Sequence, residues 1–240
     1  MIKEMDWNEF GLRTEESFLF DDVFSKFLKS APNGSALEVG CAGGSFLYHI
    51  AHKYQYQPFG VDFSDQLPLT NKIFIEHNYP LPTLYKEDFL TWQPAQKFDL
   101  VMSFGFIEHF DNPADIIKRH LDLLKPGGKL IISLPHFAHA QYLFHWLIDR
   151  DNLAKHNTKI MSLPAMRQAL SGLPVKILHL SYHDTFAFWT ERKSLAFWEK
   201  VVSKVIVTFG SILVKVMGEK WPNVLFSPNI ICIAEKDQIE

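Results

Sequence analysis

A turn of small residues between an apolar run and a helix-compatible segment is the part of the sequence best suited to bind a ligand. The apolar run covers residues 35–39 and contains Glu38. The turn consists of Gly40, Cys41, Ala42, Gly43 and Gly44. Small residues let the backbone bend sharply, so a flat or charged small molecule could lie directly on main-chain atoms there. For this segment alone, an ordinary strand-to-helix turn is the alternative interpretation.

A second carboxylate stands at the end of the next predicted strand, over residues 57–62. Asp62 follows Glu38 at about the 20-residue interval expected across one strand–helix–strand unit. An acid at this place can accept hydrogen bonds from both hydroxyls of a ribose. Alone, Asp62 could equally cap a helix or lie in a solvated loop. Two acids at neighbouring strand ends beside a glycine-rich turn favour a nucleoside site.

The spacing of the glycines disfavours a dinucleotide as the ligand. The pyrophosphate fingerprint requires glycine at the first, third and sixth positions of the turn. Counted from Gly40, these positions hold Gly40, Ala42 and Ser45, so two of the three fail. Glu38 would also repel a pyrophosphate. A cationic or zwitterionic adenosine ligand suits the site better, and a dehydrogenase becomes the weaker hypothesis.

Five segments, in order along the chain, resemble the motifs of class I S-adenosylmethionine-dependent methyltransferases, in particular the small-molecule branch that includes quinone-biosynthesis enzymes. The segments are Leu37–Gly44, Phe59–Ser64, Tyr85–Phe89, Phe98–Phe110 and Leu123–Pro135. Together they cover roughly residues 36–136 and form a specific set. One departure is Ala42, which stands where the family usually has its second glycine and would narrow the cleft.

The resemblance implies a cofactor site for S-adenosyl-L-methionine. Its residues would be Glu38, Gly40, Cys41, Ala42, Gly43, Gly44, Asp62, Phe63, Glu87, Asp88, Phe89, Ser103 and Phe104. The glycines would approach the methionine portion, and Glu38 would orient its amino group through water. Asp62 would bind the ribose, and the phenylalanine after it would pack on the adenine. Asp88, or alternatively Glu87, would accept from the adenine amine, and Ser103 would present its carbonyl to the ammonium.

Two histidines are candidates for acid–base chemistry on the methyl acceptor. A base is needed only when the nucleophile arrives protonated, and methyl transfer itself requires neither a covalent nucleophile nor a metal. His109 follows Glu108 and resembles the substrate-facing histidine of the family. His136 follows the predicted fifth strand at the same edge of the sheet. The spacing of His136, His139 and His145 fits no recognised ligand set, so we expect no metal.

The pattern of apolar runs and turns predicts an α/β fold with a Rossmann-like, doubly wound, seven-stranded sheet and helices on both faces. Strands are predicted near 35–40, 57–62, 83–87, 98–103, 129–134, 173–180 and 228–235. Most would be parallel, joined by right-handed crossovers, with a helix from Asn112 to Leu124 between the fourth and fifth. The resemblance implies that the last strand runs antiparallel between the fifth and sixth.

Three segments lie outside this pattern within the single methyltransferase domain expected over 1–240. Residues 1–34 are predicted to form an N-terminal helical cap, with an amphipathic helix over 15–30. The insertions 136–170 and 182–223 are expected to form a lid over the substrate.

Composition limits the partners. The net charge of −3 gives no basic character that would favour nucleic acid. The fourth strand ends in Met102–Gly105, not in the Pro-Pro-aromatic tetrapeptide with which the resembled superfamily methylates base amines. Two cysteines are too few for a disulfide framework, and Met1–Trp7 has no apolar signal core. We therefore expect a cytoplasmic protein with no nucleic-acid partner.

The later insertion contains an unusually apolar stretch over residues 193–218. Its apolar runs are too short to span a bilayer, and Lys204 and Lys215 interrupt them. Packing on the core or in a homodimer interface is one hypothesis, because apolar stripes at helical spacing are mostly buried. A peripheral membrane helix or a lipid-facing lid is the other, supported by Trp198, Phe209 and the lysines.

The leading functional hypothesis is methylation of a small acceptor, and a hydroxyl on a sugar, a glycolipid or a quinone-like compound is the favoured target. The many phenylalanines of the chain favour an acceptor with apolar surface. A protein methyltransferase and a non-catalytic subunit with the same fold are the alternatives. Intact Glu38, Asp62 and Asp88 argue against loss of ligand binding.

Overall fold

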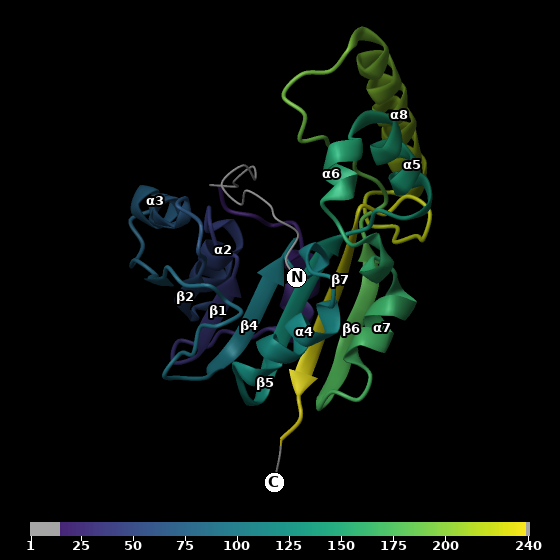
Figure 1. Cartoon of the computed structure of the whole chain (residues 1–240). Helices are drawn as coiled ribbons and strands as arrows, with labels where there is room; N and C mark the ends of the chain where they lie inside the picture. Colours follow the sequence, from purple (N-terminus) through teal and green to yellow (C-terminus); the bar gives the residue numbers. More distant parts are fainter. Residues whose placement is uncertain (1–14, 239–240) are drawn as a thin grey trace.

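A mixed seven-stranded sheet forms the centre of the computed structural model, which describes residues 15–238 (Figure 1). The strands are β1 (Ser35–Val39), β2 (Gln57–Val61), β3 (Thr83–Tyr85), β4 (Phe98–Phe104), β5 (Leu124–Pro135), β6 (Val175–His183) and β7 (Asn229–Lys236). Their order is β3-β2-β1-β4-β5-β7-β6, with β7 antiparallel to both of its neighbours and the other pairs parallel. The predicted sheet, with its antiparallel last strand, is confirmed.

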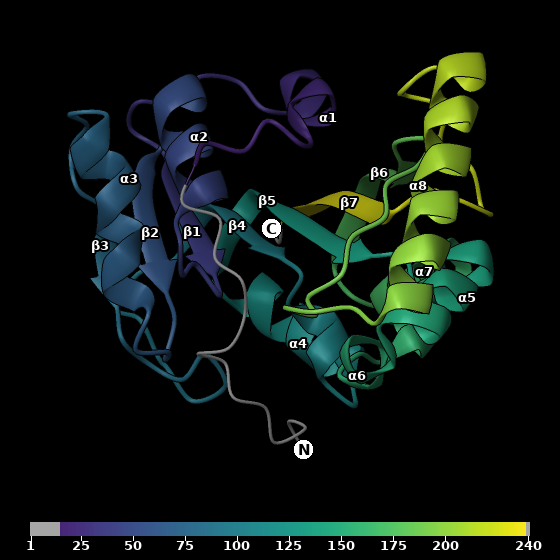
Figure 2. The same cartoon turned by 90° about the horizontal axis from the view of Figure 1, so that it is seen from above.

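Helices cover both faces of this sheet (Figure 2). They are α1 (Asp21–Phe27), α2 (Ser45–Tyr54), α3 (Thr70–Glu76), α4 (Pro113–Asp122), α5 (His139–Ile148), α6 (Arg150–Ala154), α7 (Leu163–Leu170) and α8 (Phe197–Met217), with short 3-10 helices η2 (Leu67–Leu69), η3 (Ile107–His109) and η4 (Thr158–Ile160). Leu37 and Val101 pack in the core beneath α4 and α7, whereas Leu100 and Met102 pack beneath α1, α2 and α3. Successive strand residues face opposite sides, so continuous apolar strands fill two cores.

The predicted N-terminal helix over 15–30 is wrong in its extent, because α1 begins at Asp21. Asp21 and Asp22 occupy its first turn, where acidic side chains interact favourably with the positive end of the helix dipole. The preceding residue, Phe20, is buried rather than part of a helix face. Residues 1–14 of the predicted cap lie outside the described part of the chain.

Two other predicted elements differ in their bounds. The predicted fifth strand is longer than expected, because β5 starts at Leu124 and includes the Pro-Gly-Gly turn; the β4–β5 register shifts between Phe98 and Leu100 to accommodate the extra residues. The helix predicted from Asn112 to Leu124 accordingly ends at Asp122.

The apolar stretch of the later insertion forms one continuous helix, α8, of which only a narrow face is buried. Its buried residues are Glu199, Ile206 and Gly210. Gly210 allows close contact with Phe186, since a Cβ at this glycine would lie 2.0 Å from the phenylalanine ring. Core packing therefore does not account for most of the apolar residues of α8. None of the helices formed by residues 15–238 is long and apolar enough to cross a membrane.

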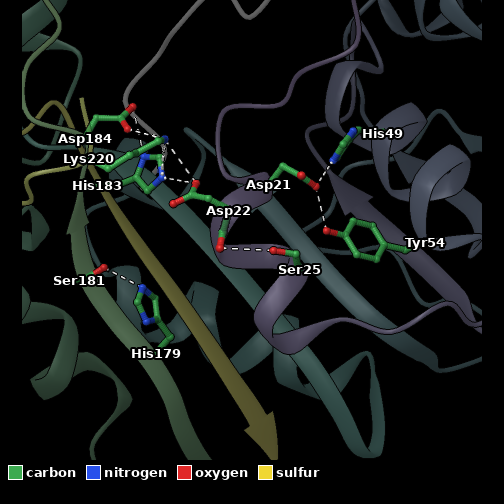
Figure 3. A network of polar contacts seen from close by, with 10 residues as sticks. All are labelled: Asp21, Asp22, Ser25, His49, Tyr54, His179, Ser181, His183, Asp184 and Lys220. Atoms are coloured by element: carbon green, nitrogen blue, oxygen red, sulfur yellow. Dashed lines mark hydrogen bonds and ion pairs between the residues drawn. The ribbon is translucent and has the colours of Figure 1, made fainter. Parts of the chain in front are cut away.

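Helix α1 is held in place by its two acids, one on each side (Figure 3). Asp21 lies 2.9 Å from the Nε2 atom of His49 and accepts a 2.9 Å hydrogen bond from the hydroxyl of Tyr54. It also pairs with Lys53. These partners all belong to α2, so Asp21 fixes α1 to the helix that follows the glycine-rich turn.

Asp22 ties α1 to the opposite side of the molecule. Its carboxylate lies 3.0 Å from the Nε2 atom of His183, at the end of β6, and 3.4 Å from the Nζ atom of Lys220. Lys220 in turn lies 2.7 Å from Asp184 (Figure 3). Together the two acids connect α2 with the end of β6, and Phe20, directly before α1, lies against Phe104, with ring centroids 6.1 Å apart.

Replacing Asp21 by alanine should destabilise the protein, because the buried His49 and the Tyr54 hydroxyl lose an acceptor. We expect a loss of about 1–3 kcal/mol, seen as a fall of several degrees in the melting temperature. Ser25→Ala, on the same helix but with an exposed hydroxyl, is the matched control and should leave the melting temperature nearly unchanged. Equal melting temperatures for both variants would show that α1 is not held through Asp21.

Candidate functional site

A cavity opens at the carboxyl ends of β1, β2 and β4. These three strands bring Glu38, Asp62 and Phe104 to its wall. The side of the cavity away from the sheet is formed by residues before α1 and in both insertions, including Phe20, His156 and Trp189. The cavity thus lies where ligands of doubly wound sheets bind.

Most of the predicted cofactor residues line this cavity. They are Glu38, Gly40, Ala42, Gly44, Asp62, Phe63, Glu87, Asp88, Phe89 and Phe104. Cys41, Gly43 and Ser103 do not. The thiol of Cys41 packs toward Gly60, where a Cβ would lie 2.4 Å from its sulfur, and Ser103 is fully buried within the sheet. The side chains of Cys41 and Ser103 thus point away from the cavity, and the place of Cys41 in the cofactor site and the backbone carbonyl role of Ser103 stay predictions.

The turn requires small residues for two physical reasons. Gly40 and Gly44 have φ angles of 71° and 72°, which side-chain-bearing residues rarely adopt. A Cβ at Gly40 would lie 2.9 Å from the ring of Phe106, and one at Gly44 would lie 2.8 Å from the methyl group of Thr70. The predicted tight turn before α2 is therefore set both by backbone conformation and by close packing.

Asp62 connects this turn to the end of β2. Its Oδ2 atom accepts a 3.1 Å hydrogen bond from the backbone N–H of Ala42, and its Oδ1 atom accepts a 2.8 Å bond from that of Ser64. A carboxylate has about four acceptor sites, so both oxygens retain capacity for a ligand. The side chain is thus fixed in orientation before any ligand arrives.

Glu38 is the buried charge of the site. It is 5% exposed, and its Oε2 atom has no hydrogen-bond partner among residues 15–238. Burial raises the pKa of Glu38 to about 8; the backbone N–H of Leu47 acts in the opposite direction, and the charge of Asp62 raises it further. A group of this kind is stabilised as a carboxylate when a cation enters the cavity.

A second polar cluster, formed by Glu108, His109 and His156, lines another part of the cavity. One ligand-type atom from each lies within 4.8 Å of the others, and all three residues are buried. Neither carboxylate oxygen of Glu108 has a hydrogen-bond partner in the described part of the chain, and burial raises the pKa of Glu108 to about 8. Such a group could exchange a proton near neutral pH, and the three side chains could also hold a metal ion.

The two histidines of this cluster are oriented by backbone carbonyls. The Nδ1 atom of His109 lies 3.1 Å from the carbonyl oxygen of Lys155, and that of His156 lies 2.6 Å from that of Asn152. Their rings are 4.6 Å apart. Burial, with a further contribution from His156, lowers the pKa of His109 to about 3, so the imidazole is neutral at physiological pH.

His136, the other histidine predicted to act on the acceptor, does not line the cavity. Its neighbours Pro135 and Phe137 line the cavity, whereas His136 is fully buried and does not. Its Nδ1 atom lies 2.9 Å from the carbonyl of Ser227, and its ring packs 4.6 Å from that of Tyr182. The geometry corrects the expectation that His136 acts on the acceptor, because this histidine connects the end of β5 to the segment before β7.

Sequence reasoning expected the two insertions to cover the substrate but did not name the residues that they contribute to the wall. Asn152, His156, Trp189 and Glu191 all line the cavity. The Oδ2 atom of Asp149 accepts 2.8 Å hydrogen bonds from the Thr190 hydroxyl and the Glu191 backbone, which ties the two insertions together. No motif marks these residues, because they approach the site only through tertiary packing.

Comparison with known proteins identifies the chain. A sequence profile for a family described as methyltransferase domain matches residues 13–179. The chain belongs to this family. It is 36% identical over 106 residues to the probable thiol methyltransferase 2 of Arabidopsis thaliana, covering 42% of this chain and 46% of that protein. It is 30% identical over 146 residues to the ubiquinone biosynthesis O-methyltransferase of Coxiella burnetii, covering 58% and 60%. The chain thus spans about half of the length of these curated relatives.

The fold is also that of solved methyltransferases. The N-methyltransferase NodS from Bradyrhizobium japonicum, in complex with S-adenosyl-l-homocysteine, superposes with a TM-score of 0.55 at 12% identity, over 91% of this chain and 83% of that one. At this identity the likeness concerns the fold. The predicted class I methyltransferase family and Rossmann-like sheet are confirmed, and the expected cofactor is the methylated form of the ligand bound in the NodS structure.

Proposed function

We propose that this chain transfers a methyl group from S-adenosylmethionine to a small-molecule acceptor, namely to a hydroxyl of a sugar, a glycolipid or a quinone-like compound. One observation carries the proposal. Two carboxylates from neighbouring strand ends, Glu38 and Asp62, share a cavity beside a turn too small to obstruct a ligand. A sulfonium-bearing adenosine with an ammonium group supplies the positive charge and the ribose hydroxyls that such a pair can bind.

Each end of the cofactor would meet a different part of the wall. Glu38 would bind the ammonium, and the prefixed carboxylate of Asp62 would accept from the ribose hydroxyls. Phe63 would pack on the adenine. Asp88, or alternatively Glu87, would accept a hydrogen bond from the adenine amine. Gly40 and its neighbours would leave room for the methionine chain. The position of all these side chains on one cavity supports the assignment.

The reaction is an in-line displacement at the methyl carbon. A lone pair of the acceptor oxygen would form the new C–O bond while the C–S bond broke and its electron pair stayed on sulfur, which would remove the sulfonium charge. Holding donor and acceptor in line at about 3 Å can supply roughly 7–11 kcal/mol of the barrier reduction. The hydroxyl proton must then pass to a base.

Glu108 is better matched to accept that proton than His109. With a pKa of about 8, Glu108 is ionised in about a tenth of the molecules at pH 7, and only this fraction can act as the base. That carboxylate binds a proton much more strongly than His109, whose pKa is about 3. His109, the histidine expected to face the substrate, would then bind and orient the acceptor. Neither role needs a metal ion.

The remaining wall favours an acceptor with apolar surface. Phe20, Phe106, Phe110, Phe137 and Trp189 line the cavity around the polar cluster. Aromatic walls with a few placed polar groups are typical of sites for small organic ligands. This supports a quinone-like or lipid-bearing acceptor over a protein side chain, which would need an open groove.

A non-catalytic role is the competing function, and ligand binding distinguishes it. We expect purified protein to bind S-adenosylmethionine by calorimetry, and Asp62→Ala to weaken that binding by about ten- to a hundredfold, because hydrogen bonds to charged groups contribute roughly 1.5–3 kcal/mol. Asp65→Ala, an exposed acid of the same loop that does not line the cavity, is the control. Absence of binding by the unaltered protein would refute the proposed function.

The affinity for S-adenosylhomocysteine should rise with pH between 6 and 8. In the empty cavity Glu38 holds a proton up to a pH of about 8, and binding of the ligand's ammonium expels it. The gain can approach about tenfold per pH unit until the ammonium itself deprotonates near pH 8. Calorimetry in buffers of different ionisation enthalpy measures the released proton. The Glu38→Gln variant should bind S-adenosylhomocysteine weakly and without this pH dependence. If the variant kept the pH dependence of the unaltered protein, the ammonium would bind elsewhere.

Glu108→Gln and His109→Ala should both cut methyl transfer and leave cofactor affinity intact. Loss of a general base costs about 10²–10⁴-fold, so we expect the larger loss for Glu108→Gln. Transfer of a radiolabelled methyl group into small-molecule extracts gives the rate. A chelator should leave the rate of the unaltered enzyme unchanged. If the chelator abolished transfer and a divalent ion restored it, the cluster would be a metal site instead.

A further inference from the structure

Helix α8 exposes a continuous apolar stripe that the proposed chemistry does not use. Its members recur every three or four residues and therefore share one face: Trp198, Val201, Val205, Phe209, Ile212 and Val216. Their exposed fractions run from 41% at Phe209 to 74% at Val216. Monomeric proteins rarely leave so long a contiguous apolar surface in water, so such a surface marks an interaction site.

The adjacent face of the same helix is cationic. Lys200, Lys204 and Lys215 are spaced by one and by about three helical turns, so they also share a face. All three are exposed, and none forms an ion pair with any residue among 15–238. The one acid of α8, Glu199, is buried and already pairs with Arg192 while accepting a 2.6 Å hydrogen bond from the Ala196 backbone.

Elements beside α8 expose apolar side chains as well. Tyr142, Leu143 and Trp146 are exposed on α5, which packs against α8. The segment after α8 adds Trp221 and Leu225. Both views place α8 and α5 together at one side of the molecule, away from α3 (Figures 1 and 2). Tryptophans at the border of a cationic apolar surface are typical of proteins that bind the membrane interface.

We propose that this surface, α8 with the exposed residues of α5, docks on an anionic lipid bilayer, with α8 lying along the membrane surface. Charge selects this occupant. A second copy of the chain would bring three lysines against three lysines, and α8 offers no exposed acid to pair with them. Anionic headgroups pair with the lysine face, while the apolar stripe enters the boundary with the acyl chains.

Sedimentation of the full chain with vesicles tests the proposal. The protein should bind vesicles of phosphatidylglycerol and phosphatidylcholine, bind pure phosphatidylcholine far more weakly, and dissociate as salt is raised. Val201→Ser, Val205→Ser and Ile212→Ser combined should weaken binding at least tenfold. The matched control combines Leu69→Ser, Ile75→Ser and Leu81→Ser, which are similarly exposed on the α3 side, do not line the cavity and should bind normally.

A second pair of variants isolates the charge contribution. Replacing Lys200, Lys204 and Lys215 by glutamine should weaken binding to anionic vesicles about a hundredfold, at about fivefold per lysine. Replacing the exposed Lys29, Lys118 and Lys176 by glutamine should not. Failure of the unaltered protein to bind anionic vesicles would overturn the proposal. So would a concentration-dependent dimer that the triple serine variant abolishes, because the occupant would then be a second copy. Cofactor binding, measured separately, bears on the methyl transfer and not on this surface.

Discussion

The site depends on keeping the carboxylate of Glu38 out of water. Raising its pKa to about 8 from an ordinary value of 4.5 means that burial penalises the charged form by on the order of 5 kcal/mol. The empty protein avoids that cost by holding a proton, and a bound cation removes the need for it. The same desolvation makes Glu38 selective for a positively charged partner, because only a cation makes its ionisation favourable, whereas beside a neutral ligand the group keeps its proton and gains no charge–charge attraction.

Asp62 and the glycine-rich turn make this arrangement rigid. The carboxylate of Asp62 accepts hydrogen bonds from the backbone N–H groups of Ala42 and Ser64, so the end of β2 and the turn after β1 cannot move independently. Gly44 begins α2 in a left-handed conformation and lies against Thr70, whose hydroxyl donates to the carbonyl of Cys41. Preorganisation of this kind lowers the entropic cost of binding, since the ligand does not have to order this turn.

The sheet and the cofactor end of the site could be predicted from sequence because they follow local rules. The place of small residues in a turn, and of acids at strand ends, follows directly from their position in the sequence relative to the predicted strands. The residues on the other side of the cavity come together through tertiary packing, which local patterns do not reveal, because His156 reaches Glu108 from a separate insertion. The place of His136 also follows from tertiary packing, because its contacts with Ser227 and Tyr182 come from residues far away in the sequence.

The proposed membrane surface and the cavity are mechanically connected through the segment between β6 and α8. Glu191 lines the cavity and its backbone donates to Asp149, while the next residue, Arg192, pairs with Glu199 at the start of α8. Few residues therefore separate a wall of the reaction site from the helix that would rest on lipid. An acceptor with an apolar chain could stay partly in the bilayer while its polar end reached the cavity that Glu108 and Trp189 line. A protein that takes such an acceptor gains from docking, because the membrane concentrates the substrate at the surface to which the cavity wall is joined.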